Sequence, residues 1–266
     1  FIALPRTGAT VQEMFTEPVF GDVSLWLTSG IFFLLVLLLT LRESSVVDII
    51  GKILTPALVL GLLTLIVAGV ISPLGEISDD HMMDNVVVAG INSGYQTMDV
   101  LAAMIFGIII VKSVMDKGYT ATHVKYKVVR NASLVAAIAL LVIYFGLTYL
   151  GATVSGTYNL RINRSELLVN ITSGLRGHAG VIILGIIVAL ACLTTAVALV
   201  SASADYFSTL SKGRLNYKLL AAAICLFSAF VANFGPDKIV ALAAPILSLV
   251  YPGALTLIIL SLFRDR

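Results

Sequence analysis

The chain has 266 residues, of which 59% are hydrophobic and 12% are charged, with a net charge of +2 and a mean hydropathy of +1.02. A soluble domain averages about 25% charged residues, so the composition excludes an ordinary soluble domain and predicts an all-α polytopic membrane protein. The weak net charge gives no indication of a nucleic-acid partner. Both cysteines lie in apolar segments and imply no disulfide framework.

Apolar segments recur along the whole chain, beginning with residues 1–4, which resemble the tail of a further span, so we expect a fragment. A polar connection is predicted over residues 5–22. Seven complete spans are then predicted at residues 23–41, 53–71, 85–111, 132–152, 180–203, 219–232 with flanking residues, and 239–263. The connections are too short for a soluble domain, so residues 1–266 are expected to form a single transmembrane domain. In the loop over residues 153–178, the stretch LLVNITSGL predicts a short surface helix.

The span over residues 85–111 reads NVVVAGINSGYQTMDVLAAMIFGIIIV and has a polar centre. A charge such as that of Asp99 costs about 2.5–3.5 kcal/mol at the middle of a membrane helix. We therefore expect a broken helix, in which one half ends near Asn92 and the second starts near Asp99, with Thr97 or Asp99 as its N-cap. Secondary transporters build substrate sites from such breaks. The candidate substrate-binding residues are Asn92, Ser93, Gly94, Tyr95, Gln96, Thr97 and Asp99.

Two interpretations of this break stay open at the level of sequence. A helix–helix hydrogen-bond site without a ligand would also place polar groups inside a span. Intramembrane ionisable residues, however, generally mark functional sites. Asp99 itself fits two roles, that of a helix cap and that of a ligand contact.

The span around residues 180–203 carries small and hydroxyl side chains on one helical face: Ala191, Thr194, Thr195, Ala198, Ser201, Ala202 and Asp205. This face fits either close helix packing or a hydroxyl-lined cation site, because small hard cations prefer oxygen ligands. Lys52, at the edge of the second span, is either a snorkelling anchor or a buried proton-linked lysine. The sequence has no Ser/His/Asp set, phosphate loop or zinc spacing, so an enzyme is not predicted.

Basic residues divide unequally between the two sides of the predicted spans. If the span over residues 23–41 ends in the cytoplasm, twelve of the 17 lysines and arginines are cytoplasmic. The five on the other side are Arg6, Arg161, Arg164, Arg176 and Lys238. The positive-inside rule favours this orientation over the inverted one.

Four runs of sequence are similar to the bacterial branched-chain amino acid carriers, the Leu/Ile/Val:cation symporters of the BrnQ type. They are GKILTPALVLGLL (51–63), SGYQTMDVLAAMIFGIIIV (93–111), ALACLTTAVALVSASADYF (189–207) and NFGPDKIVALAAPILSLVYP (233–252). The similarity extends over essentially the whole chain. Members of this family resemble LeuT-like transporters, with two inverted five-helix repeats followed by extra helices. The resemblance implies that the chain holds the end of the third helix and then helices four to ten, with the broken span as the sixth.

The same resemblance implies a carrier in the bacterial cytoplasmic membrane that imports leucine, isoleucine and valine with a coupling ion, Na⁺ or H⁺, and with no other cofactor. The break would receive the polar head of the amino acid, and Tyr95 and Phe106 its branched tail. In LeuT-like scaffolds the eighth helix offers a carbonyl and two hydroxyls to Na⁺, a pattern that Ala191, Thr194 and Thr195 fit. The alternatives are a proton-driven carrier, an amino-acid carrier of other specificity, and an inactive truncated membrane module.

Overall fold

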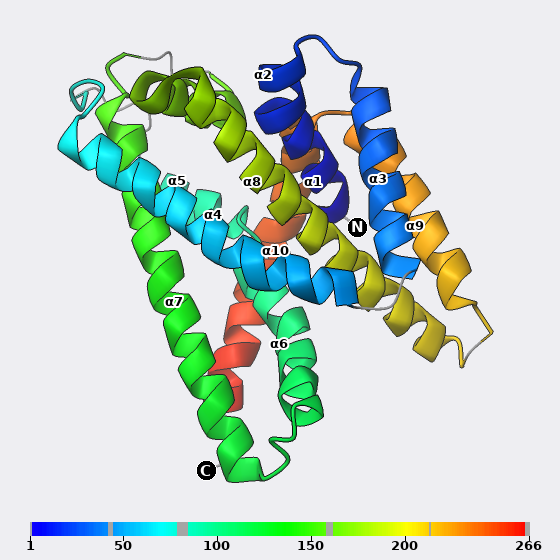
Figure 1. Cartoon of the computed structure of the whole chain (residues 1–266). Helices are drawn as coiled ribbons and strands as arrows, with labels where there is room; N and C mark the ends of the chain where they lie inside the picture. Colours follow the sequence, from blue (N-terminus) through cyan, green and yellow to red (C-terminus); the bar gives the residue numbers. More distant parts are fainter. Residues whose placement is uncertain (1, 42–44, 79–84, 158–161, 213, 264–266) are drawn as a thin grey trace. The chain divides into compact units, whose positions relative to one another are not determined.

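The structure is a computed structural model that describes all residues except 1, 42–44, 79–84, 158–161, 213 and 264–266 (Figure 1). Every regular element in these described ranges is helical, which confirms the all-α class. The elements are α1 (Ala3–Val11), the π-helix η1 (Gln12–Thr16), α2 (Glu17–Phe20), α3 (Leu25–Leu41), α4 (Ser45–Ile71), α5 (Val86–Tyr95), α6 (Asp99–Asp116), α7 (Thr122–Thr153), α8 (Arg164–Leu210), α9 (Tyr217–Ala232) and α10 (Pro236–Phe263).

Three helices in the described part of the chain are long and apolar enough to cross a membrane: α7, α8 and residues Pro236–Ser261 of α10. A fourth candidate arises if Ala3–Phe20 and Leu25–Leu41, bent by 116° relative to each other, count as one broken span. The membrane class is thus confirmed, but the described residues provide three or four candidate spans rather than seven. The apolar helices Thr55–Ile71 and Tyr217–Ala232 are shorter than the roughly 20 residues that cross a bilayer core.

The segment predicted as a polar connection, residues 5–22, is helical as far as Phe20, which was not expected. One side of it is buried, including Leu4, Ala9 and Val11. A short helix of mixed composition is stabilised mainly by the packing of such a face rather than by its own propensity. The packing is close, since a Cβ atom added to Gly8 would lie 2.8 Å from Cε2 of Phe33.

The chain divides into two compact units, which are described separately. Unit 1 comprises Phe1–Ser78 and Gly146–Ile239, and unit 2 comprises Asp79–Phe145 and Val240–Arg266. The main core of unit 1 joins α1, α3, α8 and α9, and α3 and α9 lie side by side (Figure 1). Its most deeply buried members include Phe33, Val36, Val200, Ala204 and Ala221. On the α3–α9 contact, the ring of Trp26 meets that of Phe230 edge-on, with centroids 6.0 Å apart.

A second core in unit 1 joins α4, the end of α7 and the first part of α8, through Leu65, Ile66, Leu150, Val154 and Ile171. The first part of α8 contains the stretch LLVNITSGL, so the prediction of a helix there is confirmed. It begins at Asn163, whose side-chain oxygen accepts a hydrogen bond from the Ser165 N–H. It ends at Gly177, where φ is 65° and ψ is −165°, and the chain turns into the long apolar part of α8.

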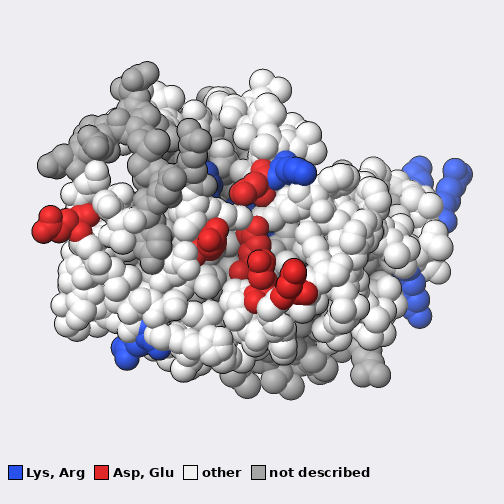
Figure 2. Space-filling view, turned by 90° about the horizontal axis from the view of Figure 1, so that it is seen from above, with Lys and Arg blue, Asp and Glu red and all other residues white. Residues whose placement is uncertain are grey.

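Carboxylates gather in the middle of the face that Figure 2 shows from above. In unit 1, Glu13 lies within electrostatic range of Glu17 and Asp237, and it accepts a hydrogen bond from the side-chain amide of Asn163 at 2.7 Å. Among the described residues, no three His, Cys, Asp or Glu side chains come together in a way that could hold a metal ion.

Unit 2 consists of α5, α6, most of α7 and most of α10. It contains no large apolar core among its described side chains. Four buried side chains recur at helical spacing along α10: Ala243, Leu247, Tyr251 and Ala254. Several of the remaining contacts in this unit are made by polar groups near the junction of α5 and α6.

Candidate functional site

The predicted broken helix is present, and the break between its two halves is shorter than expected. Helix α5 continues to Tyr95 and α6 begins at Asp99, so only residues 96–98 interrupt the helical path. The expectation that the first half ends near Asn92 is therefore wrong by about one turn. The turn is made by Met98, which has φ 61° and ψ 14°, a left-handed conformation that is uncommon for a residue other than glycine.

The carbonyl groups that end α5 are paired. The N–H groups of residues 96, 97 and 98 donate to the carbonyls of Ser93, Gly94 and Tyr95 at 3.2, 3.2 and 3.3 Å. The Thr97 hydroxyl also donates to the Gly94 carbonyl, at 2.8 Å. Thr97 therefore closes α5 instead of capping α6, and the N-cap role predicted for it is wrong.

Unpaired backbone donors lie on the other side of the break, at the start of α6. Met98 occupies the N-cap position and provides no side-chain cap. The Val100 N–H donates to the Tyr251 hydroxyl at 3.4 Å. In the described part of the chain, the N–H groups of Asp99 and Leu101 have no hydrogen-bond partner. Free donors in the first turn of a helix form a natural site for a carboxylate, aided by the helix dipole.

Asp99 is the first residue of α6 and not its N-cap, which is Met98. The predicted capping role of Asp99 is therefore wrong, and its side chain makes a different contact. The hydroxyl of Tyr144 in α7 donates to Asp99 Oδ2 at 2.5 Å. No lysine or arginine in the described ranges pairs with this carboxylate. The helix N-terminus and the tyrosine stabilise its negative charge, while its other oxygen can accept hydrogen bonds from a cation. A carboxylate acceptor and free N–H donors thus share one helical turn.

Two tyrosines of this site were not identified from the sequence. Tyr251 of α10 is 2% exposed, and its ring stacks on that of Tyr95 with centroids 4.8 Å apart and an interplanar angle of 28°. Because it also accepts from Val100, it contacts both halves of the break. Tyr144 is the partner of Asp99. The available signal was a phenol inside an apolar span, since such a hydroxyl needs a polar partner.

The other predicted substrate residues are distributed unevenly around the break. Asn92, Ser93, Gly94 and Thr97 are exposed, and Gln96 is half-buried. A Cβ atom added to Gly94 would meet no atom within 4 Å. Phe106 follows Asp99 by seven residues in the same helix, which is about 10 Å along the axis. Tyr95 is therefore the predicted apolar contact that borders the break, and Phe106 lies two turns away.

The predicted cation residues belong to unit 1 and lie on α8. The Thr194 hydroxyl donates to the Ala191 carbonyl at 2.9 Å, so two of the three expected ligands are bonded to each other. The Thr194 oxygen and the Ala191 carbonyl keep lone pairs that can still accept or coordinate. Thr195 is exposed. Lys52, the candidate proton-linked lysine, lies in a stretch of α4 whose side chains are outside the described part of the chain.

A model of one protein family, described as "Branched-chain amino acid transport protein", matches the chain over residues 1–266. Among individual proteins, the chain is 36% identical over 274 residues to the branched-chain amino acid permease BraB of Bacillus subtilis. It is 37% identical over 268 residues to the branched-chain amino acid transport system 2 carrier protein of Pseudomonas aeruginosa. It is 34% identical over 271 residues to the branched-chain amino acid permease BrnQ of Bacillus subtilis.

These alignments cover 99%, 99% and 100% of the chain and 61% of each relative. The chain therefore spans about three fifths of the length of the curated relatives that it matches. No solved structure matches the chain at a significant level.

Proposed function

The chain belongs to the branched-chain amino acid transport protein family, and on that premise we propose that it forms part of a secondary carrier that imports leucine, isoleucine and valine across the bacterial cytoplasmic membrane. It is a membrane protein of a transport family and not an enzyme. The observation that carries the proposed site is the junction of α5 and α6, where the Asp99 carboxylate and the free N–H groups of Asp99 and Leu101 lie in one helical turn.

An amino acid in solution carries an ammonium and a carboxylate on adjacent atoms, and this junction offers a partner for each. In the proposed complex the substrate carboxylate accepts hydrogen bonds from the free N–H groups at the start of α6. The ammonium donates to Asp99, whose orientation is fixed by the Tyr144 hydroxyl. Exposed polar residues 92–94, together with Gln96 and Thr97, complete the polar surroundings.

The branched tail of the substrate is proposed to lie against Tyr95, with Phe106 further along α6. A pocket that accepts one branched side chain discriminates by only about 1–3 kcal/mol per methylene group. Leucine, isoleucine and valine should therefore compete with one another for uptake, and alanine should bind more weakly. A carrier of other specificity on the same scaffold would show a different order of competition.

The proposed scaffold is the LeuT-like inverted repeat, with residues 1–266 as one carrier domain and twelve basic residues on the cytoplasmic side. Labelling tests this orientation. Single cysteines at Asp80 and Arg161, which lie outside the described residues, should react with an impermeant thiol reagent from outside. Cysteines at Lys117 and Lys212 should not react. The reverse labelling pattern would contradict both the orientation and the helix assignment.

Na⁺ is the proposed coupling ion, held by the Ala191 carbonyl and the hydroxyls of Thr194 and Thr195. Residues i, i+3 and i+4 share one helix face, so three oxygens can converge on one ion. Neutral oxygens suit a monovalent cation, whereas a divalent ion normally recruits carboxylates. Leucine uptake by the full-length carrier in proteoliposomes should follow an imposed Na⁺ gradient. A dependence on the pH gradient alone, or unchanged Na⁺ dependence in Thr194→Val and Thr195→Val, would contradict this assignment.

Gly94→Val tests the substrate site directly. Because a Cβ atom at Gly94 meets no atom of the protein within 4 Å, the larger side chain should leave the fold intact and obstruct only a ligand. We expect abolished leucine uptake with normal amounts of protein in the membrane. Normal uptake by this variant would show that the break has a structural role only, as in a membrane module that does not transport.

A further inference from the structure

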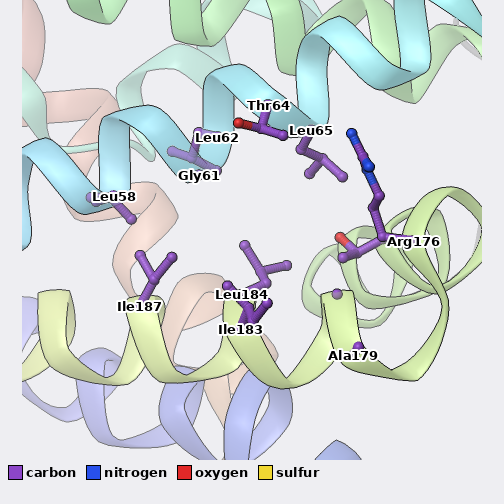
Figure 3. Close-up of a pocket in the computed structure, with 12 residues that line it drawn as sticks. Leu58, Gly61, Leu62, Thr64, Leu65, Arg176, Ala179, Ile183, Leu184 and Ile187 are labelled. Atoms are coloured by element: carbon purple, nitrogen blue, oxygen red, sulfur yellow. The ribbon is translucent and has the colours of Figure 1, made fainter.

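An apolar cavity of about 370 Å³ lies within unit 1, between α4 and α8. Figure 3 shows apolar side chains of the two helices facing one another across it, with Leu58 and Ile187 at one end and Arg176 at the other. It belongs to a different unit from the α5–α6 break and shares no residue with it. It therefore needs an explanation of its own.

Glycines determine the shape of both ends. A Cβ atom on Gly61 would lie 3.0 Å from Ile187 Cδ1, so α4 and α8 approach closely at the Leu58 end. At the other end, the backbone turn at Gly177 separates the two parts of α8. A Cβ atom on Gly180 would lie 2.5 Å from the Cβ atom of Arg176, so the stem of this arginine crosses directly over the start of the apolar part.

The described lining of the cavity contains one cationic side chain and no carboxylate. Arg176 is the one charged residue among those that line it, and no carboxylate in the described part of the chain pairs with it. The hydroxyl protons of Thr64 and Thr172 are already donated to backbone carbonyls, at 2.7 and 2.8 Å. The cavity therefore offers guanidinium donors to an anion and no carboxylate for an ammonium group.

The shape suits a hydrocarbon chain. From Ala179 to Ile187 the cavity follows eight residues of α8, which is about 12 Å. Ile183, on its wall, is 59% exposed, so the cavity is open to the apolar surroundings of a membrane helix along this wall. An extended tail fits this length, and the described lining offers no carboxylate to the ammonium of an amino acid.

We propose that this cavity binds an anionic phospholipid, with one acyl chain between α4 and α8 and the phosphate on Arg176. Arginine pairs with phosphate through two parallel hydrogen bonds. Since an acyl chain is already in apolar surroundings in the bilayer, its transfer into the cavity adds little selectivity. Selection between lipids therefore rests on Arg176.

Native mass spectrometry of the detergent-purified chain tests this proposal, with palmitoyl-oleoyl phosphatidylglycerol and the phosphatidylcholine of identical chains as probes. The chain should bind phosphatidylglycerol in preference to phosphatidylcholine. Arg176→Gln should lower that binding about tenfold, because it removes a charge-assisted hydrogen-bonded pair. The matched control is Arg164→Gln, an exposed arginine of α8 that does not line the cavity, and it should leave binding unchanged.

A second variant tests the position of the tail. Ala179 is exposed and lines the cavity, so Ala179→Trp should fill the entrance without disturbing the core, and lipid binding should fall although Arg176 is retained. Equal binding of the two lipids, equal loss in Arg176→Gln and Arg164→Gln, or displacement of the lipid by leucine would each overturn the proposal. So would a cysteine at Leu62 that cross-links to another protein segment in the full-length carrier. None of these readouts depends on transport.

Discussion

Two of the turns made by a residue with positive φ, at Gly177 and at Met98, are built differently. In unit 1, α8 turns at Gly177, with φ 65° and ψ −165°. This region of backbone space is essentially restricted to glycine. In unit 2, the chain turns at Met98, with φ 61° and ψ 14°. An L-residue can adopt that conformation, but at a cost of roughly 1–2 kcal/mol.

The turns at Gly177 and Met98 also differ in the side chains that surround them. The segment before Gly177 packs through Ile171 and Leu175 into an apolar cluster. The turn at Met98 is followed by Asp99 and is held by the hydroxyls of Tyr144 and Tyr251. The first interruption thus redirects a helix at low backbone cost. The second keeps a strained residue and a charge within an apolar chain, which is the arrangement expected at a functional site.

The largest effect should follow from removing the charge at the second interruption. Asp99→Asn keeps the shape of the side chain and its hydrogen bond with Tyr144, but it removes the acceptor for the substrate ammonium. Hydrogen bonds to charged groups contribute about 1.5–3 kcal/mol, so apparent leucine affinity in proteoliposome uptake should fall roughly ten- to a hundredfold. Asp116→Asn, at the exposed end of the same helix, should leave uptake unchanged. Equal effects of the two variants would show that only net charge matters.

A change at the first interruption should act on folding. Gly177→Ala forces a Cβ atom into a backbone region nearly closed to L-residues, so stability should fall by about 1–3 kcal/mol in thermal unfolding in detergent. Gly151→Ala is the control, because Gly151 lies in α7 and a Cβ atom there meets nothing within 4 Å. That variant should be neutral or slightly stabilised. Unchanged stability in Gly177→Ala would mean that the turn does not need glycine.

The tyrosine partner of Asp99 should matter less than the charge itself. Tyr144→Phe removes the hydroxyl that donates to Asp99 at 2.5 Å, so the carboxylate loses its fixed orientation and keeps its charge. We expect leucine affinity to fall by roughly tenfold or less, about 1.4 kcal/mol, because the substrate ammonium keeps its charged acceptor and loses only the fixed orientation of that acceptor. Tyr149→Phe on the same helix should have no effect. A loss as large as that of Asp99→Asn would instead indicate that the hydroxyl contacts the substrate.

The smallest effect concerns backbone strain. Met98→Gly relieves the left-handed conformation but adds freedom to the unfolded chain, so the net gain in stability should be below about 1 kcal/mol. Lys212, with φ 53°, provides a matched site at the end of α8. Lys212→Gly should give a similar gain without any change in uptake, whereas Met98→Gly should reduce leucine uptake. Reduced uptake in both variants would show that the turn at Met98 has no closer link to transport than the turn at Lys212.

These residues also show which parts of the molecule were accessible from sequence. The break near Asp99 was predicted because a polar cluster within an apolar span is visible in the order of residues. The helix over Leu167–Leu175 was predicted from its local pattern. The helical character of residues 5–20 was not predicted, because it depends on burial against distant segments such as Phe33. Tyr144 and Tyr251 were missed for the same reason, since 45 and 151 residues separate them from their hydrogen-bond partners.

The edge-on contact of Trp26 with Phe230 has a practical consequence. Trp26 is the only tryptophan in the 266 residues, and it lies on the α3–α9 contact of unit 1. Its fluorescence therefore reports on unit 1, while the part of the near-ultraviolet circular dichroism that is lost in Tyr95→Phe comes from the stacked rings of Tyr95 and Tyr251 and reports on unit 2. The molecule thus carries two intrinsic optical probes, one in each unit. Loss of the tyrosine signal before the tryptophan signal changes would show that the break opens while unit 1 remains folded.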